Sequence, residues 1–313
     1  MLGEFLNAVS AVVVLLMLMA VGYFMGTKGW MKAEEKKFLS KYIINIAVPC
    51  NCINGLLNNL DQSMLAQAGL MLVSAIIGVV ITILLGMRLP KNRWGVFAAM
   101  VGVSNTLFVG LPLSTQLFGD VCVPYVMIYY LANTIFTQSV ILMLVERSGT
   151  ASHSRGIKGF LKDVFTKPPI LTVIASVLML IVGFRPPEVF MSFAKYISGS
   201  VSPLALIYCG FIIYELGLSN LRPSQLRQMK GLPTMLAARL VISPLICAGM
   251  CRLFGITGLA YQVFVVESAL PVVSQVTVMA GDFGADDKYA ATGATLSTLA
   301  CFITIPVLMV LMG

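Results

Sequence analysis

Charged residues are scarce in this sequence of 313 residues. Asp, Glu, Lys and Arg make up 11% of it and hydrophobic residues 58%, whereas an ordinary soluble domain carries about 25% charged residues. So few charges cannot cover the surface of a soluble protein of this length. The apolar residues form long continuous runs, while a transmembrane β-barrel would show short alternating segments. The composition therefore predicts an all-α polytopic membrane protein.

Side chains for catalysis and metal binding are also lacking in the apolar runs. His153 is the only histidine and lies in a polar loop, which excludes a histidine-dependent serine protease in the membrane. The aspartates lie in loops or at the ends of runs, so no pair exists for an aspartyl protease. No Walker-type loop is present, and the seven cysteines lack the partners of a zinc site. We expect no enzyme activity, metal or cofactor.

Ten apolar runs are each near the ~20 residues that a helix needs to cross the hydrocarbon core. They cover roughly residues 5–26, 38–58, 64–87, 94–118, 121–145, 169–184, 191–217, 232–254, 259–280 and 289–312. The first run is of full span length and follows no basic segment, so we interpret it as a retained helix rather than a signal peptide.

Basic residues are distributed unevenly over the loops. Loops that join odd to even spans, with their flanks, hold 17 of the 21 Lys and Arg residues. Because cytoplasmic loops are rich in these residues, we predict that these loops are cytoplasmic and that both termini are extracytoplasmic. The net charge of +8 then reflects multi-pass topology in the cell (inner) membrane, with the lipid bilayer as partner, and not binding to nucleic acid.

The longest loop divides the chain into two sets of five spans. We predict a first five-helix repeat at residues 1–146, a basic cytoplasmic linker at 147–168 and a second repeat at 169–313. Since five is odd, the second set enters the membrane from the opposite side, which is the geometry of an inverted repeat.

Spans 4 and 9 are interrupted at matching places. Span 4 contains Asn105, Gly110 and Pro112 near its middle, and span 9 has Pro271 between polar neighbours. A membrane helix breaks only where protein or a water-filled cavity lies alongside. A pair of interrupted spans in corresponding positions is typical of a transporter's binding site.

Several motifs together resemble the auxin efflux carrier family. Residues 104–112 are similar to the Asn-x-x-Phe-x-Gly-x-Pro signature of span 4 in that family. Further matching segments run along the whole chain: Lys167-Pro168-Pro169-Ile170, Val201-Ser202-Pro203-Leu204-Ala205, Arg239-Leu240-Val241-Ile242-Ser243-Pro244-Leu245, Ala269-Leu270-Pro271, Ser297-Thr298-Leu299 and Ile305-Pro306. The resemblance implies ten helices in two inverted repeats, with spans 4 and 9 broken and crossing at mid-membrane.

The same resemblance implies a class of substrate. Plant members export auxin, and bacterial members are associated with small organic acids such as malate and malonate. This chain lacks the long central hydrophilic loop of many plant members, so a bacterial-type carrier is the closer match.

The expected substrate site lies at the two interruptions. Proline suits the first turn of a helix, so Pro112 and Pro271 are predicted to start second half-helices whose positive ends face one cavity and favour an anion. The predicted substrate-binding residues are Asn51, Asn105, Thr106, Gly110, Pro112, Gln116, Ser268, Pro271, Ser274 and Gln275. The alternative is that these residues only satisfy backbone groups freed by the prolines.

Two charged residues lie deep in predicted spans, Arg239 in span 8 and Glu267 in span 9. A charge at mid-membrane costs at least ~2.5–3.5 kcal/mol on insertion scales, so a functional or paired role is the default. We predict that Glu267 is a proton or coupling-ion site, or a partner of Arg239. Arg239 is assigned to the same coupling site, with reach to the cytoplasmic headgroups as the alternative.

These features favour a secondary active or facilitative transporter of small organic (carboxylate) anions, working by alternating access. A sodium-coupled organic anion symporter of the bile-acid-symporter type is one alternative, and a membrane receptor or channel is another. Coupling to protons or to sodium is left open. Gly22 and Gly26 form a Gly-x-x-x-Gly pair, which predicts close helix packing and leaves a homodimer open.

Overall fold

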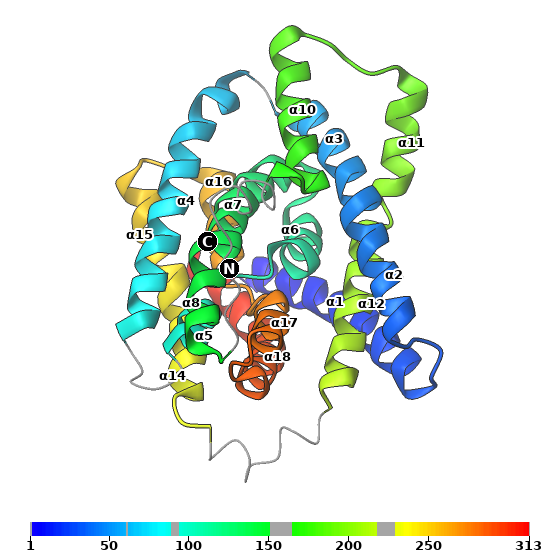
Figure 1. Cartoon of the computed structure of the whole chain (residues 1–313). Coiled ribbons are helices and arrows are strands. Elements are labelled where there is room, and N and C mark those ends of the chain that lie inside the picture. Colours follow the sequence, from blue (N-terminus) through cyan, green and yellow to red (C-terminus); the bar gives the residue numbers. More distant parts are fainter. Residues whose placement is uncertain (1, 61, 89–93, 151–164, 218–228, 313) are drawn as a thin grey trace.

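The computed structural model describes residues 2–60, 62–88, 94–150, 165–217 and 229–312 (Figure 1). Within these ranges the regular secondary structure is helical, apart from an isolated antiparallel bridge between Ser104 and Val272. Five helices are long and apolar enough to cross a membrane, and shorter apolar helices accompany them. The prediction of an all-α polytopic membrane protein is confirmed. Most of the predicted linker 147–168, and His153 with it, lies outside the described residues.

One group of helices, which we call the panel, combines the start of the chain with its middle. Its members are α1 (Leu2–Thr27), α2 (Ala33–Tyr42), α3 (Val48–Asn59), α10 (Pro168–Val182), α11 (Glu188–Ser198) and α12 (Val201–Leu216). Helix α1 packs along α12, while α10 and α11 pack against α3. In Figure 1 these helices occupy one side of the molecule.

The remaining helices form a second group, which we call the core group. Its members are α4 (Gln62–Arg88), α5 (Trp94–Gly102), α6 (Leu111–Phe118), α7 (Val123–Phe136), α8 (Leu142–Ser148), α14 (Leu232–Ala237), α15 (Ser243–Leu253), α16 (Gly258–Ser268), α17 (Gln275–Asp282) and α18 (Asp287–Met312). Helix α4 packs on α5, α7 and α15, and α17 packs on α18. A buried cluster that includes Phe97, Met100, Met235 and Tyr289 joins α5, α14 and α18.

Three of the prolines in the spans follow a turn of π-helix. The turns Ile43–Ala47, Thr106–Gly110 and Ala238–Ile242 precede Pro49, Pro112 and Pro244. A proline ring clashes with the carbonyl one turn earlier and offers no N–H. Neighbouring π turns are one way in which membrane helices accommodate that loss. These helices therefore continue past their prolines.

Close packing of α1 on α12 depends on glycine from both helices. A Cβ added at Gly22 would collide with the backbone of Ile207, and one added at Gly210 would collide with the backbone of Met19. A Cβ at Gly26 would meet the ring of Tyr214. The Gly-x-x-x-Gly pair is therefore used inside the chain, as the sequence pattern predicts for close packing.

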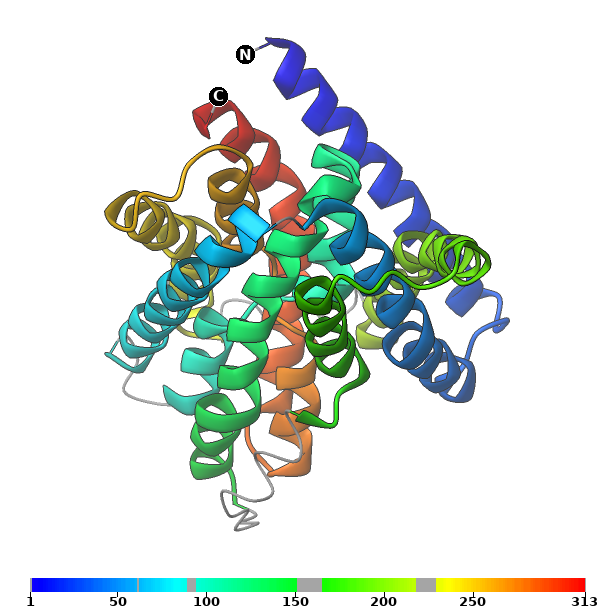
Figure 2. The same cartoon turned by 90° about the horizontal axis from the view of Figure 1, so that it is seen from above.

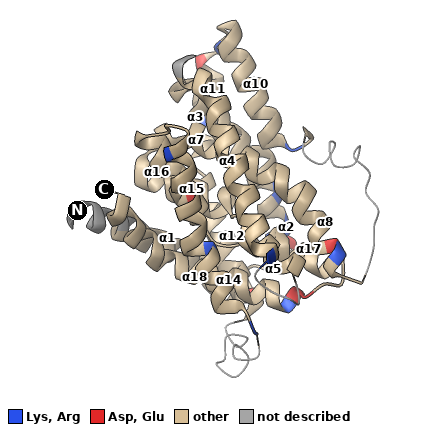
Figure 3. Ribbon diagram, turned by 90° about the vertical axis from the view of Figure 1, so that its left-hand side faces the viewer, with Lys and Arg blue, Asp and Glu red and all other residues tan. Residues whose placement is uncertain are grey.

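The two ends of the chain lie side by side (Figures 1 and 2). They are the first turn of α1 and the last turn of α18. Figure 3 shows acidic and basic residues gathered around α5, α8 and α17, on the side of the molecule away from the two termini. The helical stretches between these charged ends and the two termini are almost free of charged residues, as expected for segments that face lipid.

Candidate functional site

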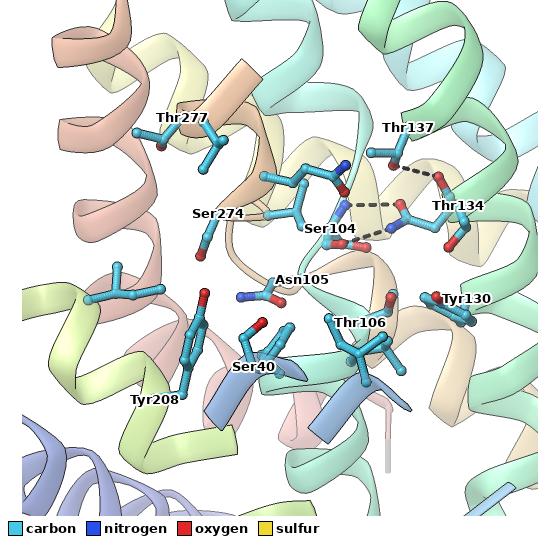
Figure 4. A pocket seen from close by; sticks show the side chains of 18 of the residues that line it. Ser40, Ser104, Asn105, Thr106, Tyr130, Thr134, Thr137, Tyr208, Ser274 and Thr277 are labelled. Carbon is cyan, nitrogen blue, oxygen red and sulfur yellow. Dashed lines mark hydrogen bonds between the residues drawn. The ribbon is translucent and has the colours of Figure 1, made fainter. Parts of the chain in front are cut away.

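A cavity of about 530 Å³ lies at the place where the helices that follow α5 and α16 begin, at Thr106 and Gln275. Its inner end is polar and receives Asn105, Thr106, Thr134 and Ser274 from three different parts of the chain (Figure 4). A volume in this range and a few convergent polar groups are typical of sites for small molecules.

The first interruption, residues 103–105, is held by an amide side chain of the next helix. Asn133 of α7 accepts a hydrogen bond from Ser104 N (3.0 Å) and donates one to Ser104 O (2.8 Å). Both groups are buried, and a buried backbone group without a partner is costly. Asn133 thus binds the backbone of Ser104 as a neighbouring strand would in a sheet. Dashed lines mark these hydrogen bonds at Ser104 in Figure 4.

The second interruption, residues 269–274, is held in the same way. Ser297 of α18 accepts a hydrogen bond from Val272 N (3.0 Å). The two interruptions also bind each other, because Asn105 N donates to Pro271 O (3.0 Å) beside the Ser104–Val272 bridge. The two interrupted apolar segments therefore contact each other at this point, which we call the crossing.

Two helix starts face the cavity. The chain resumes its helix at Thr106, and Asn105 O accepts hydrogen bonds from Val109 N (3.2 Å) and Gly110 N (3.0 Å). The other start is α17, at Gln275. The first N–H groups of a helix have no partner within it, and its first turn carries a partial positive charge. Both starts line the cavity.

The half-helices begin at places that differ from the prediction. The one in span 4 starts before Pro112, and the one in span 9 starts after Pro271. The hydrogen bond from Asn105 N to Pro271 O explains both shifts. This bond keeps Pro271 inside the second interruption and fixes Asn105 as the N-cap residue of the next helix. The helix of span 4 therefore resumes at Thr106, and Pro112 follows its π-helical turn.

Arg239 lies at the opposite face of the crossing and is 1% exposed. Its three nitrogens donate to Leu270 O (2.8 Å), Val101 O (2.8 Å) and Ser268 O (2.7 Å). These carbonyls belong to the last turns of α5 and α16 and to the second interruption. The guanidinium therefore caps the negative ends of both first half-helices.

Glu267 is fully buried on α16 and points at α6. One carboxylate oxygen accepts a hydrogen bond from the Ser114 hydroxyl (2.7 Å), and the other has no partner among the described residues. A Cβ added at Gly110 would collide with this carboxylate. Glu267 and Arg239 do not form an ion pair in the described part of the chain, so the predicted partnership between them is absent.

The mouth of the cavity carries charged residues from the panel. Lys36 of α2 forms an ion pair with Glu215 of α12 (2.6 Å), and Lys167 lies at the start of α10. Asn45, in the π turn after α2, lines the wall between mouth and crossing. Two cationic residues and one anionic residue thus surround the entrance.

The structure brings four of the predicted binding residues to the cavity wall: Asn105, Thr106, Ser274 and Gln275. The backbone of Ser268 and Pro271 forms the crossing, while Gly110 and Pro112 lie along the helix beyond it. Gln116 is exposed and does not line the cavity. Asn51 donates to the Ser198 hydroxyl (2.8 Å), where α11 ends, and so joins two panel helices.

Sequence reasoning missed the contribution of span 5. Asn133, Thr134, Thr137 and Gln138 all line the cavity, and Gln138 donates to Gln275 (3.2 Å). Their spacing puts them on one face of a helix. A polar stripe in an apolar span was therefore the available signal. Ser297 belongs to the Ser297-Thr298-Leu299 segment of the family resemblance, but nothing else distinguishes it from the other hydroxyl residues in its span.

A helical bundle with a polar cavity at the crossing of two interrupted apolar helices is the architecture of a membrane transporter. The model of the membrane transport protein family matches residues 7–309. The chain therefore belongs to that family, which is the family of the auxin efflux carriers.

Two archaeal relatives are similar to the chain over nearly their whole length. A protein of Methanocaldococcus jannaschii is 27% identical, over 95% of this chain and 96% of its own. A protein of Methanothermobacter thermautotrophicus is 25% identical, over 96% and 97%. Both are described as uncharacterized transporters.

Proposed function

We propose that this protein carries small organic (carboxylate) anions across the cell membrane by alternating access at the crossing. The observation that carries the proposal is that two helix starts, at Thr106 and Gln275, line one cavity. Each contributes about half a positive charge, which favours a carboxylate. At the second start Val276 N and Thr277 N already donate to Val273 O and Ser274 O, so there the partial charge rather than these N–H groups acts on the anion. The opposite helix ends, which would repel an anion, are capped by Arg239 on the other face.

The proposed fold has ten spans in two inverted five-helix repeats. Packing supports this pairing: span 1 (α1) lies on span 7 (α12), as span 6 (α10) lies on span 2 (α3). The crossing supports it too, because spans 5 and 10 each supply the side chain, Asn133 or Ser297, that binds an interruption. Two unrelated halves would not be expected to share both features.

The proposed orientation places both termini outside and the basic loops in the cytoplasm. Lys36 and Lys167, at the mouth of the cavity, lie in segments that flank predicted cytoplasmic loops. The cavity would then be open to the cytoplasm in this structure. Alternating access would move the core group, which contains both interruptions, against the panel.

Coupling, where it occurs, is assigned to Glu267. An acid buried beside a broken helix is placed to bind and release a proton as its surroundings change. Cys122 and Tyr129 are titratable groups in its surroundings among the described residues. Glu267 does not line the cavity, so substrate and coupling sites would be separate but adjacent.

Counterflow in proteoliposomes preloaded with a panel of mono- and dicarboxylates tests the proposal. We expect saturable exchange with at least one acid. Asn105→Ala should lower kcat/KM roughly 10- to 150-fold, because a hydrogen bond to a charged group contributes about 1.5–3 kcal/mol. The Asn105 side chain points into the cavity (Figure 4).

Asn58→Ala is the matched control, since Asn58 is exposed and bonds only within α3 to Asn54 in the described structure. It should exchange like the unmodified protein. Absence of exchange with every acid, in protein whose helix content is intact, would contradict the carrier and favour a receptor. Flux without saturation would favour a channel.

Glu215→Gln tests the charge of the mouth. The Lys36–Glu215 pair is partly exposed, with 27% and 40% of the side chains accessible, so its loss should change stability by less than about 1 kcal/mol. Removing the acid should lower KM for an anion about twofold at low salt, as ~0.4 kcal/mol per charge at ~10 Å in water predicts. Transport assays at low and high salt measure this, and an effect that survives high salt would contradict it.

A further inference from the structure

We propose that the guanidinium of Arg239 is a built-in cation that holds the crossing together, in the place where a coupling cation would otherwise bind. The inference deepens the proposed function and rests on it for its transport readout. It assigns Arg239 a positioning role rather than a role in coupling, and it excludes the sodium-coupled alternative.

The first argument is the set of ligands around the guanidinium. Three carbonyl oxygens from two broken helices converge on it at 2.7–2.8 Å: those of Val101, Ser268 and Leu270. In transporters with discontinuous helices, unwound carbonyls and the C-terminal ends of half-helices are the groups that bind sodium. Here the same kind of oxygen set is already filled by a side chain of the protein.

The second argument is charge balance. The ends of α5 and α16 each carry about −0.5 of a charge, so together they balance one positive charge. Arg239 is 1% exposed and has no carboxylate partner in the described part of the chain. The Tyr129 hydroxyl lies beside it and adds a neutral dipole. The crossing is therefore electrically satisfied without an additional ion.

The third argument concerns Glu267, the residue to which a sodium ion would be drawn. Such an ion needs several oxygen ligands, and the nearby carbonyls of Ser268 and Leu270 are bound to Arg239. The Ser114 hydroxyl is the remaining polar group hydrogen-bonded to the carboxylate among the described residues. A proton needs one oxygen only, so this surrounding suits a proton and not sodium.

Geometry also explains why arginine and not lysine occupies this place. The guanidinium offers donors in a fixed planar fork, and here Nε, Nη1 and Nη2 each reach a different carbonyl. The fork joins the end of α5 to the end of α16 and so sets the distance between the two half-helices. Their continuations, at Thr106 and Gln275, are the helix starts that line the cavity.

The transport test compares sodium with choline as the only small cation. Wild-type counterflow should proceed at equal rates in both. Arg239→Ala should lower the rate about tenfold or more, since three buried acceptors lose their donor, and millimolar guanidinium should restore part of it. Arg252→Ala, an exposed arginine later in the same span, is the control and should behave like wild type in all solutions.

Thermal unfolding supplies a test that needs no substrate. Guanidinium should raise the Tm of Arg239→Ala more than that of Arg252→Ala, choline should raise neither, and sodium should leave the wild-type Tm at its value in choline. The comparison of sodium with choline uses wild-type protein alone, so it does not depend on whether a variant folds. If no acid exchanges, the proposed function fails while these Tm differences still decide the role of Arg239.

Three results would overturn the inference. The first is wild-type exchange or a wild-type Tm that depends on sodium. The second is Arg239→Ala protein with unchanged rate and Tm. The third is a guanidinium effect on Tm no larger in Arg239→Ala than in Arg252→Ala. If the alanine variant does not fold, Arg239→Lys replaces it in both experiments. A transport rate and a Tm below those of wild type, with measurable transport remaining, support the proposal. Values equal to those of wild type oppose it.

Discussion

Asn133→Leu is expected to destabilise the protein by about 2–6 kcal/mol, because each buried backbone group left without its partner costs about 1–3 kcal/mol and Asn133 serves two. These are the N–H and the carbonyl of Ser104, in the interruption of span 4. Leucine is similar in size and apolar, so packing changes little. Thermal unfolding followed by a thiol-reactive dye suits this chain, since six of its seven free cysteines are buried.

Graded variants separate hydrogen bonding from packing at this position. Asn133→Asp has the same shape and, with its carboxyl protonated, keeps an acceptor for Ser104 N and a donor for Ser104 O, so at low pH it should be more stable than Asn133→Leu. At high pH it should be less stable, because its ionised form is a buried unpaired charge. Asn58→Leu, on the exposed face of α3, is the control and should have little effect. A loss for Asn133→Leu no larger than the ~0.6 kcal/mol average for an interhelical hydrogen bond in a membrane protein would contradict the assignment.

The existence of the two interruptions could be predicted, but their register could not. Asn105, Gly110, Pro112 and Pro271 are visible in the sequence as breakers in apolar runs. Where each helix resumes depends on hydrogen bonds between segments far apart in the chain, above all Asn105 N to Pro271 O. A proline alone does not decide the start of a half-helix, because a preceding π-helical turn allows the helix to continue past the proline.

The two deep charges were predicted from their rarity in apolar spans, while their partners were not. Arg239 binds three backbone carbonyls, and a carbonyl has no signature in the sequence because every residue carries one. The expected pairing with Glu267 is the simplest inference from opposite charges in neighbouring spans. Half-helix ends act as the counter-charge instead, and only the three-dimensional arrangement reveals which ends face inward.

Glu267→Gln is expected to keep exchange and to abolish accumulation driven by a pH gradient. Glutamine has the shape of a protonated glutamic acid, so it can keep the contact with Ser114 while binding no proton. One pH unit is worth about 1.36 kcal/mol per proton, so a carrier coupled to one proton concentrates its substrate up to about tenfold. Uptake of a labelled acid into proteoliposomes with an imposed gradient should show that ratio fall to one.

Glu215→Gln is the matched control, because it removes a carboxylate at the mouth of the cavity rather than at the crossing. It should accumulate substrate as the unmodified protein does. Accumulation by Glu267→Gln equal to that of the control would show that protons move elsewhere. Glu267 is the one buried carboxylate among the residues that the structure describes, so that outcome would assign coupling to a group other than a buried carboxylate. Absence of accumulation in the unmodified protein, the control and the variant alike would favour a uniporter. Accumulation of substrate in a sodium gradient, without a pH gradient, would instead indicate a sodium site. That result would contradict the proposal that Arg239 occupies the carbonyl oxygens which such a site would use.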